Sequence, residues 1–117
     1  MTPLQLRGLI AAPHTPLRED LTVDLDRIPA QVEHLLGSGI QGLYVLGSTG
    51  EGPSMTTAER RAVAEAFVRA VDHRVPVVLQ VGHPAMEEAK GLAKHAAAIG
   101  ADAFSAVFTS YFPVSGV

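Results

Sequence analysis

The chain has 117 residues, of which 47% are hydrophobic and 18% charged, and its formal net charge is -3. This composition excludes an intrinsically disordered chain and describes a globular segment with room for one domain. The Lys and Arg residues form no basic run and aromatic residues are few, so we expect no nucleic-acid partner. The absence of Cys excludes disulfides and thiolate metal sites.

The N-terminal sequence MTPLQLRGLIAAPHTPL lacks the basic segment and the sustained apolar run of a secretory signal. Nowhere does an uninterrupted apolar stretch reach the roughly 18 residues that a membrane-spanning helix needs. We therefore expect a cytoplasmic protein that does not associate with a membrane.

The first half of the chain predicts a strand followed by a helix. The apolar run at residues 8–12 is closed by prolines, which is typical of a buried strand that ends in a loop. Apolar residues then recur at helical spacing over residues 25–36, where Asp24 is a candidate N-cap. Pro29 would occupy the first turn, where its missing N–H costs little, and Gly37 supplies the stop.

A second strand is predicted at residues 42–47, and the start of the helix after it can be placed. Thr56 and Glu59 have the spacing of a capping box, in which each side chain satisfies the other's backbone amide. The alternation then continues with strands at residues 75–82 and 102–108 and a helix at residues 84–99.

This order of strands and helices is the βαβ pattern of an α/β protein. The strands are apolar without alternation, which indicates a parallel sheet that is covered on both faces or closed as a barrel. A complete (β/α)8 barrel needs about 250 residues, and an open doubly wound sheet usually has further strands. We therefore expect this chain to be part of a larger domain.

The loop after the second predicted strand, residues 47–55, is unusually long. It has about nine residues, where such loops commonly have about 2 to 6. In parallel α/β folds ligands bind at the carboxyl ends of the strands, where this loop lies. Its length therefore requires an explanation.

Two explanations of this loop do not involve a site for a small carboxylate. A phosphate-binding loop is disfavoured, because the P-loop lysine is absent and Gly47, Gly50 and Gly52 do not fit G-x-G-x-x-G. A plain turn would have its glycines at positive φ and its hydroxyls bonded locally to the backbone. Composition alone favours the plain turn.

The third explanation is a site for a small carboxylate. Ser48 and Thr49 would turn two hydroxyls and their amides toward one point, which suits an anion that needs several donors. Gly47 and Gly50 would let the backbone approach closely. Glu51 is expected to be a structural acceptor for loop amides rather than a general base.

The segments GLIAAPHTPL, GLYVLGSTGEGPSMTTAER, VPVVLQVG and GADAFSAVFTSYFPVS resemble, in order and spacing, the dihydrodipicolinate synthase and N-acetylneuraminate lyase family. These enzymes are pyruvate-dependent class I aldolases with a (β/α)8 barrel. The resemblance covers essentially all 117 residues. It implies that residues 1–117 are the N-terminal part of one TIM barrel, with roughly its first four strands and three helices.

The resemblance also implies a mechanism and a site. A lysine forms an imine with the keto carbon of pyruvate, and the derived enamine adds to, or is released from, an aldehyde partner without a separate cofactor. Ser48 and Thr49 would hold the pyruvate carboxylate, and Ser48 would also link two tyrosines in a proton relay. One of these is Tyr111, which would reach across a contact in a homodimer or homotetramer. The imine lysine and the second tyrosine would lie beyond Val117.

One loop departs from the family pattern, and two lysines of this chain are alternatives to the implied imine lysine. The family usually has Pro-aromatic-Tyr where this chain has Thr109, Ser110 and Tyr111, so this loop is expected to differ in shape. Lys90 and Lys94 are expected on the surface beside carboxylates, which would keep their amines protonated and unsuited to imine formation.

No metal site is expected, because the histidines show no ligand spacing. His14 and His83 follow predicted strands and could line the mouth of a pocket. The favoured explanation for both is that they form local hydrogen bonds in their loops. The five are His14, His34, His73, His83 and His95.

The choice of aldehyde partner stays open. The sequences GSTGE, SAV and YFPVS resemble the N-acetylneuraminate lyase branch, and dihydrodipicolinate synthase, an enzyme of lysine biosynthesis, is the alternative. A third hypothesis belongs to another class. In it the chain is a catalytically inactive half-barrel, or an interaction module that pairs its exposed sheet edges with another chain.

Overall fold

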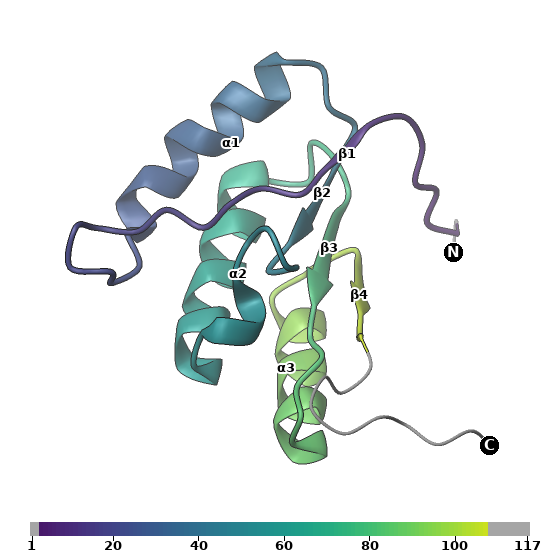
Figure 1. Ribbon diagram of the computed structural model, residues 1–117. Coiled ribbons are helices and arrows are strands. Elements are labelled where there is room, and N and C mark those ends of the chain that lie inside the picture. Colours follow the sequence, from purple (N-terminus) through teal and green to yellow (C-terminus); the bar gives the residue numbers. More distant parts are fainter. Residues whose placement is uncertain (1–2, 108–117) are drawn as a thin grey trace.

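The computed structural model describes residues 3–107, which form one parallel sheet with helices between its strands (Figure 1). The strands stand in the sheet in their order along the chain, and each pairs in parallel with the next. They are β1 (Ile10–Ala11), β2 (Gly42–Val45), β3 (Val77–Gln80) and β4 (Ala103–Ser105). The predicted α/β class is confirmed.

Three α-helices and two 3-10 turns connect the strands. In chain order they are η1 (Leu25–Arg27), α1 (Ile28–Gly37), η2 (Gly52–Ser54), α2 (Thr57–Val71) and α3 (Met86–Ala98). Each strand is followed by a helix before the next parallel strand, which is the connection that parallel pairing requires. Within residues 3–107, none of the helices is long and apolar enough to cross a membrane.

The hydrophobic core lies between the sheet and the three helices, which lie on one side of it (Figure 1). Because successive residues of a strand point to opposite faces, Leu43 and Val45 point together toward the helices, and both are fully buried. Phe67 of α2 and Ile28 of α1 pack into the same cluster and are also fully buried. Because the strands are parallel, the loops that lead from the strands into the helices all lie at the same edge of the sheet.

The strands are shorter than predicted, and the helix predicted at residues 25–36 begins as a 3-10 turn. The second strand ends at Val45 rather than at residue 47, because Leu46 adopts a left-handed conformation with φ 66° and turns the chain. Pro29 does lie in the first turn of α1, as predicted. The apolar runs therefore mark each element correctly but overestimate its length.

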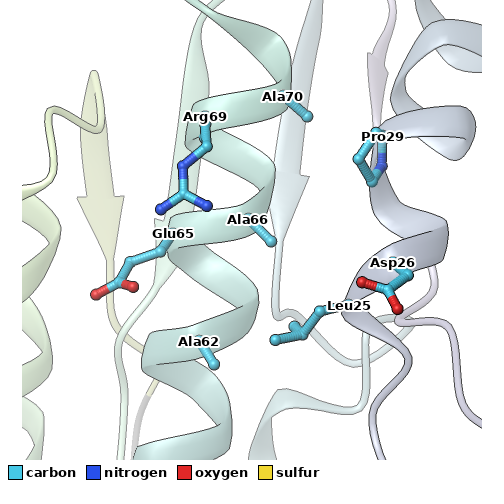
Figure 2. Close-up of a pocket in the computed structure, with 8 residues that line it drawn as sticks. All are labelled: Leu25, Asp26, Pro29, Ala62, Glu65, Ala66, Arg69 and Ala70. Atoms are coloured by element: carbon cyan, nitrogen blue, oxygen red, sulfur yellow. The ribbon is translucent and has the colours of Figure 1, made fainter.

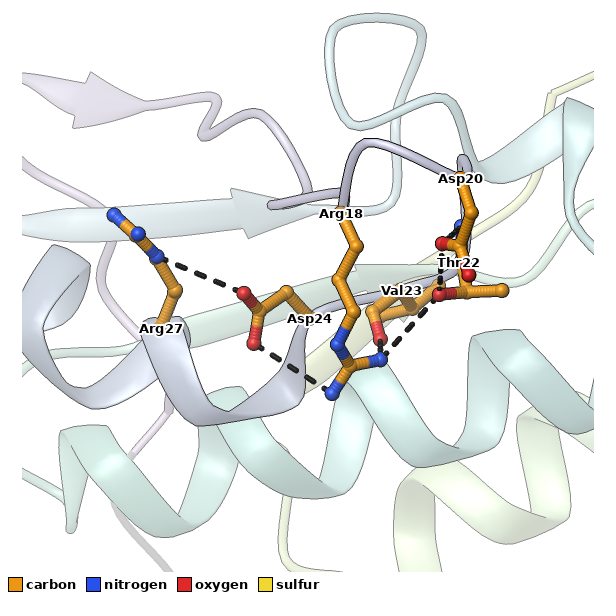
Figure 3. A network of polar contacts seen from close by, with 6 residues as sticks. All are labelled: Arg18, Asp20, Thr22, Val23, Asp24 and Arg27. Carbon is orange, nitrogen blue, oxygen red and sulfur yellow. Dashed lines mark hydrogen bonds and ion pairs between the residues drawn. The ribbon is translucent and has the colours of Figure 1, made fainter.

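Asp24 does not cap the helix that follows it, so this prediction is wrong. Its carboxylate makes no capping hydrogen bond and instead lies 3.8 Å from Nη2 of Arg18 and 3.6 Å from Nε of Arg27 (Figure 3). Arg18 also donates to the backbone oxygen of Val23 at 2.7 Å. The acidic side chain therefore holds the connection between β1 and η1 through two arginines.

The capping box at the start of α2 is confirmed. The Thr56 hydroxyl accepts a hydrogen bond from the Glu59 amide at 3.1 Å, and the Glu59 carboxylate accepts one from the Thr56 amide at 2.9 Å. The box fixes the residue at which the loop after β2 ends and α2 begins.

Replacing Thr56 by Ala is expected to lower the free energy of unfolding by about 1 kcal/mol, because the Glu59 amide loses its acceptor. Urea unfolding of the purified protein measures this change. Thr56→Ser keeps the hydroxyl and is expected to keep most of the stability. Equal stability of the Ala and Ser variants would contradict the assignment of the cap.

Candidate functional site

The candidate site is the β2–α2 loop, residues 46–56, at the carboxyl end of β2 (Figure 1). Its left-handed residues are Leu46, with φ 66°, and Glu51, with φ 57°. Gly47, Gly50 and Gly52 do not have the positive φ that a plain turn would give its glycines. The glycines serve a different purpose here.

Close packing of the backbone explains the loop glycines. A Cβ atom on Gly50 would lie 3.0 Å from the Leu46 nitrogen and 3.1 Å from the Pro13 oxygen, and one on Gly52 would lie 2.0 Å from the Leu46 oxygen. Real Cβ atoms essentially never approach a backbone atom as closely as a Cβ on Gly52 would approach the Leu46 oxygen. The loop thus folds back on its own first residue, which only glycine allows.

Ser48 and Thr49 stand side by side in the turn that this packing creates. Both residues are exposed, while their neighbours Gly47 and Gly50 are buried. The turn is closed by backbone hydrogen bonds from the Glu51 amide to the Ser48 oxygen at 3.1 Å and from the Gly52 amide to the Gly47 oxygen at 3.2 Å. The rigid backbone therefore presents two adjacent hydroxyl groups to solvent at the carboxyl edge of the sheet.

Glu51 behaves differently from the expectation for it. Among the described residues, the loop amides bond to backbone oxygens, and no hydrogen bond to the Glu51 carboxylate appears. This exposed side chain instead lines a hollow of about 620 Å³ beside the loop that follows β1. The hollow is bordered by His14, Thr15, Pro16, Leu17, Arg18, Glu19, Asp24 and Arg27.

Two buried side chains hold the loop from neighbouring strands. The Thr15 hydroxyl, in the loop after β1, donates to the Gly50 oxygen at 2.7 Å. Gln80, the last residue of β3, places its side-chain amide nitrogen 3.5 Å from the Leu46 oxygen and accepts a hydrogen bond from the Gly82 amide. The loops after three consecutive strands are therefore joined by side-chain hydrogen bonds.

Arg60 is a further candidate residue of this site, to which no motif of the sequence assigns a role. It is only 1% exposed, and its guanidinium donates to the Gly82 oxygen at 2.8 Å and the Gln80 oxygen at 2.7 Å. Its Nε has no partner among the described residues, and burial lowers the pKa of the guanidinium because the charged form loses hydration. The available signal was its spacing, since Arg60 lies three and seven residues before the apolar Val63 and Phe67.

Three further residues bear on the predicted chemistry, namely Tyr111, Lys90 and Lys94. Tyr111 lies outside the described residues. Lys90 is exposed and pairs with Glu87 at 3.0 Å, and Lys94 is exposed on the same helix, so their predicted surface position is confirmed. Within residues 3–107, no group of three or more His, Asp or Glu side chains could hold a metal ion.

A groove of about 420 Å³ lies between η1, α1 and α2 (Figure 2). It is lined mainly by the helices and includes none of the residues of the β2–α2 loop. Glu65 at its border is engaged with His95 of α3 at 2.8 Å. Because parallel α/β folds bind ligands at the carboxyl ends of their strands, this groove is not the candidate site.

The comparisons with known proteins identify the family of the chain. The model of the dihydrodipicolinate synthetase family matches residues 5–116. The chain belongs to this family. Its described fold accordingly corresponds to part of a TIM barrel, because its structural neighbours are TIM-barrel enzymes of this family.

Relatives in the family are lyases and aldolases. The probable 2-dehydro-3-deoxy-D-pentonate aldolase YjhH of Escherichia coli is 40% identical over 92% of this chain and 36% of its own length. Human N-acetylneuraminate lyase is 38% identical over 88% of this chain and 33% of its own length. This chain therefore spans about a third of the length of the curated relatives that it matches.

Solved structures give the same result. The N-acetylneuraminate lyase of Proteus mirabilis superimposes with a TM-score of 0.93 at 36% identity, over 97% of this chain and 38% of that structure. YagE of Escherichia coli, solved in complex with pyruvate, superimposes with a TM-score of 0.88 at 33% identity, over 92% of this chain and 36% of that structure.

Replacing Arg60 by Met is expected to lower the free energy of unfolding by about 2 to 4 kcal/mol, because two buried carbonyl groups lose their donor. Urea unfolding measures this loss. Arg61→Met changes an exposed arginine on the same helix and is expected to change stability by no more than about 0.5 kcal/mol. Similar losses in both variants would show that the guanidinium contacts do not matter.

Proposed function

We propose that the protein containing this chain is a pyruvate-dependent class I aldolase that acts through a lysine Schiff base. The observation that carries the proposal is the exposed pair of Ser48 and Thr49 on a rigid turn at the carboxyl end of β2. Membership in the dihydrodipicolinate synthetase family and the likeness to YagE, solved with pyruvate, support the choice of ligand.

The geometry of the β2–α2 loop suits a small carboxylate. Two adjacent hydroxyl groups and the backbone amides beside them can donate several hydrogen bonds to one anion. The buried glycines on either side keep bulk away from the turn, and the contact from Thr15 to Gly50 holds it in place. Because the donors are already positioned, binding requires little further ordering of the loop.

In the proposed mechanism, Ser48 and Thr49 bind the carboxylate of pyruvate. A lysine elsewhere in the protein attacks the keto carbon, water leaves, and the resulting imine loses a proton to give the enamine. Ser48 would also pass protons between two tyrosines, one of them Tyr111. The mechanism needs no separate cofactor.

We propose a sugar acid as the substrate, with N-acetylneuraminate as the first candidate. The names of the relatives support this choice, since several are N-acetylneuraminate lyases and YjhH is a probable 2-dehydro-3-deoxy-D-pentonate aldolase. Dihydrodipicolinate synthase activity is the alternative. Release of pyruvate from each sugar acid, compared with the synthase reaction, distinguishes the three activities.

The setting of the protein is also part of the proposal. We expect a cytoplasmic protein. We also expect it to be a homodimer or homotetramer, because the proposed relay takes Tyr111 across a contact between two subunits. The catalytically inactive interaction module is the competing hypothesis. Such a module would pair the outer sides of β1 and β4, which are the edge strands of the described sheet.

Trapping with pyruvate and borohydride tests the Schiff base. In the protein expressed from its full coding sequence, peptide mass spectrometry is expected to find one reduced pyruvate adduct on a lysine outside residues 1–117. The chain of 117 residues alone is expected to give none. An adduct on Lys90 or Lys94 would contradict the assignment of both as surface residues. Failure to trap any adduct in the full protein would remove the aldolase proposal and favour the interaction module.

Thr49→Val is expected to weaken pyruvate binding by about 1 to 3 kcal/mol, because a carboxylate oxygen loses its donor. This loss corresponds to a roughly five- to 150-fold higher Kd in a titration of the full protein with pyruvate. Thr49→Ser keeps the donor and is expected to bind normally. Ser54→Ala removes an exposed hydroxyl from the same loop and serves as the control. An unchanged Kd for Thr49→Val would return the loop to a plain turn.

A further inference from the structure

We propose that Tyr44 and Ser105 form a positioning pair that holds the β2–α2 loop in its carboxylate-binding conformation. The inference deepens the proposed function and rests on it, because it concerns the same pyruvate site. Both residues lie in sequence segments that resemble the family, but those segments assign neither of them a role. Both lie on the face of the sheet opposite the helices.

The pair spans the middle of the sheet. Tyr44 lies on β2 and Ser105 on β4, and β3 runs between them. Their hydroxyl groups lie 2.8 Å apart and are partly buried. Tyr44 is in register with Val78, while Ser105 is in register with Gln80, so the tyrosine side chain reaches across β3 toward the carboxyl edge. A hydrogen bond between next-nearest strands fixes the direction of the whole ring.

The ring of Tyr44 bears directly on the β2–α2 loop. A Cβ atom added to Gly47 would lie 2.6 Å from Cε1 and 3.0 Å from Cδ1 of the Tyr44 ring. Gly47 immediately precedes Ser48 and Thr49, and its oxygen accepts the Gly52 amide that closes the turn. A ring held in one orientation therefore gives the first residue of the turn a fixed surface to pack on.

Ser105 connects this surface to the next part of the proposed site. Its hydroxyl meets Tyr44, and its backbone oxygen accepts a hydrogen bond from the Val81 amide at 2.8 Å at the end of β3. It is also the last residue of β4, from which the sequence continues to Tyr111. The pair thereby links the carboxylate-binding turn to the strand that leads to the proposed relay tyrosine.

Packing alone does not require these two hydroxyls. A phenylalanine would place the same ring against Gly47, and an alanine would occupy the position of Ser105 on β4. Burying a hydroxyl without a partner is unfavourable, so the two groups are useful only as a pair, where each satisfies the other. Tyr44 is a positioning residue in this proposal, because it acts on the substrate only through the turn.

The test compares Tyr44→Phe, Ser105→Ala and the double variant in the protein expressed from its full coding sequence. Each single variant is expected to raise the KM for pyruvate, measured in the condensation direction, by about two- to tenfold, the usual range for one net hydrogen bond. The kcat is expected to change by less than the KM. The double variant is expected to resemble either single variant, because both remove the same bond.

Hydrogen exchange of the amides of residues 48–50 gives a second readout that needs no ligand. Exchange is expected to become about two- to tenfold faster in each single variant, with a similar factor in both. Ser38→Ala is the matched control, because it removes another hydroxyl bonded to a carbonyl, that of His34 at 3.0 Å after α1. Neither the KM nor the exchange of residues 48–50 is expected to change in this variant.

The two readouts separate the possible failures. Unchanged exchange of residues 48–50 in Tyr44→Phe and Ser105→Ala would overturn the positioning role, whatever the protein binds. An unchanged KM with a lowered Tm would also overturn it and would make the pair a packing feature only. Faster exchange in a protein that traps no pyruvate adduct would keep the pair as the support of the turn and reject the proposed function.

Discussion

The buried guanidinium of Arg60 is the interaction on which the arrangement of the carboxyl edge depends. It comes from the first turns of α2 and binds the Gln80 and Gly82 oxygens, which lie where β3 stops pairing and its chain turns away. Carbonyl groups at such a strand end need donors, and water is excluded from this position. The arginine supplies two donors at once, at the cost of burying a charge. Because Thr56 fixes the start of the same helix, the loop between β2 and α2 is attached at a defined point.

A loop attached in this way can be long without being loose. The β2–α2 loop has a left-handed residue at Leu46, and its glycines fold against the Leu46 backbone. Thr15 and Gln80 then bond to it from the strands on either side. Ser48 and Thr49 are exposed, and their side chains take no part in these contacts. A turn that is rigid everywhere except for its free hydroxyls is suited to binding a ligand, because the entropy of ordering the loop is already lost on folding.

The sequence predicted the elements and their parallel order, and it missed the tertiary contacts between their loops. Apolar runs and the capping box placed every strand and the start of α2, because burial and backbone satisfaction are local properties with a clear period. Asp24 was misassigned, because an N-cap residue type does not reveal that two arginines compete for its carboxylate. A plain turn would have its glycines at positive φ, whereas Gly50 and Gly52 are required by close packing, which depends on distant atoms such as the Pro13 oxygen. The contacts of Arg60 and the pair of Tyr44 and Ser105 are tertiary, and no motif specifies them. Only the helical spacing of Arg60 to Val63 and Phe67 hinted that Arg60 is buried.

In the proposed mechanism, this chain supplies the residues that would recognise an anion, whereas the lysine that would form the imine lies elsewhere in the protein. Imine formation needs an amine that loses its proton readily, which requires desolvation or a neighbouring positive charge. Lys90 has neither, since it is exposed and pairs with Glu87. Hydroxyl donors have no such requirement, because they bind a carboxylate without changing their protonation state. A turn at the carboxyl end of one strand can thus be completed within a third of a barrel, whereas the reactive lysine depends on surroundings that several strands must build together.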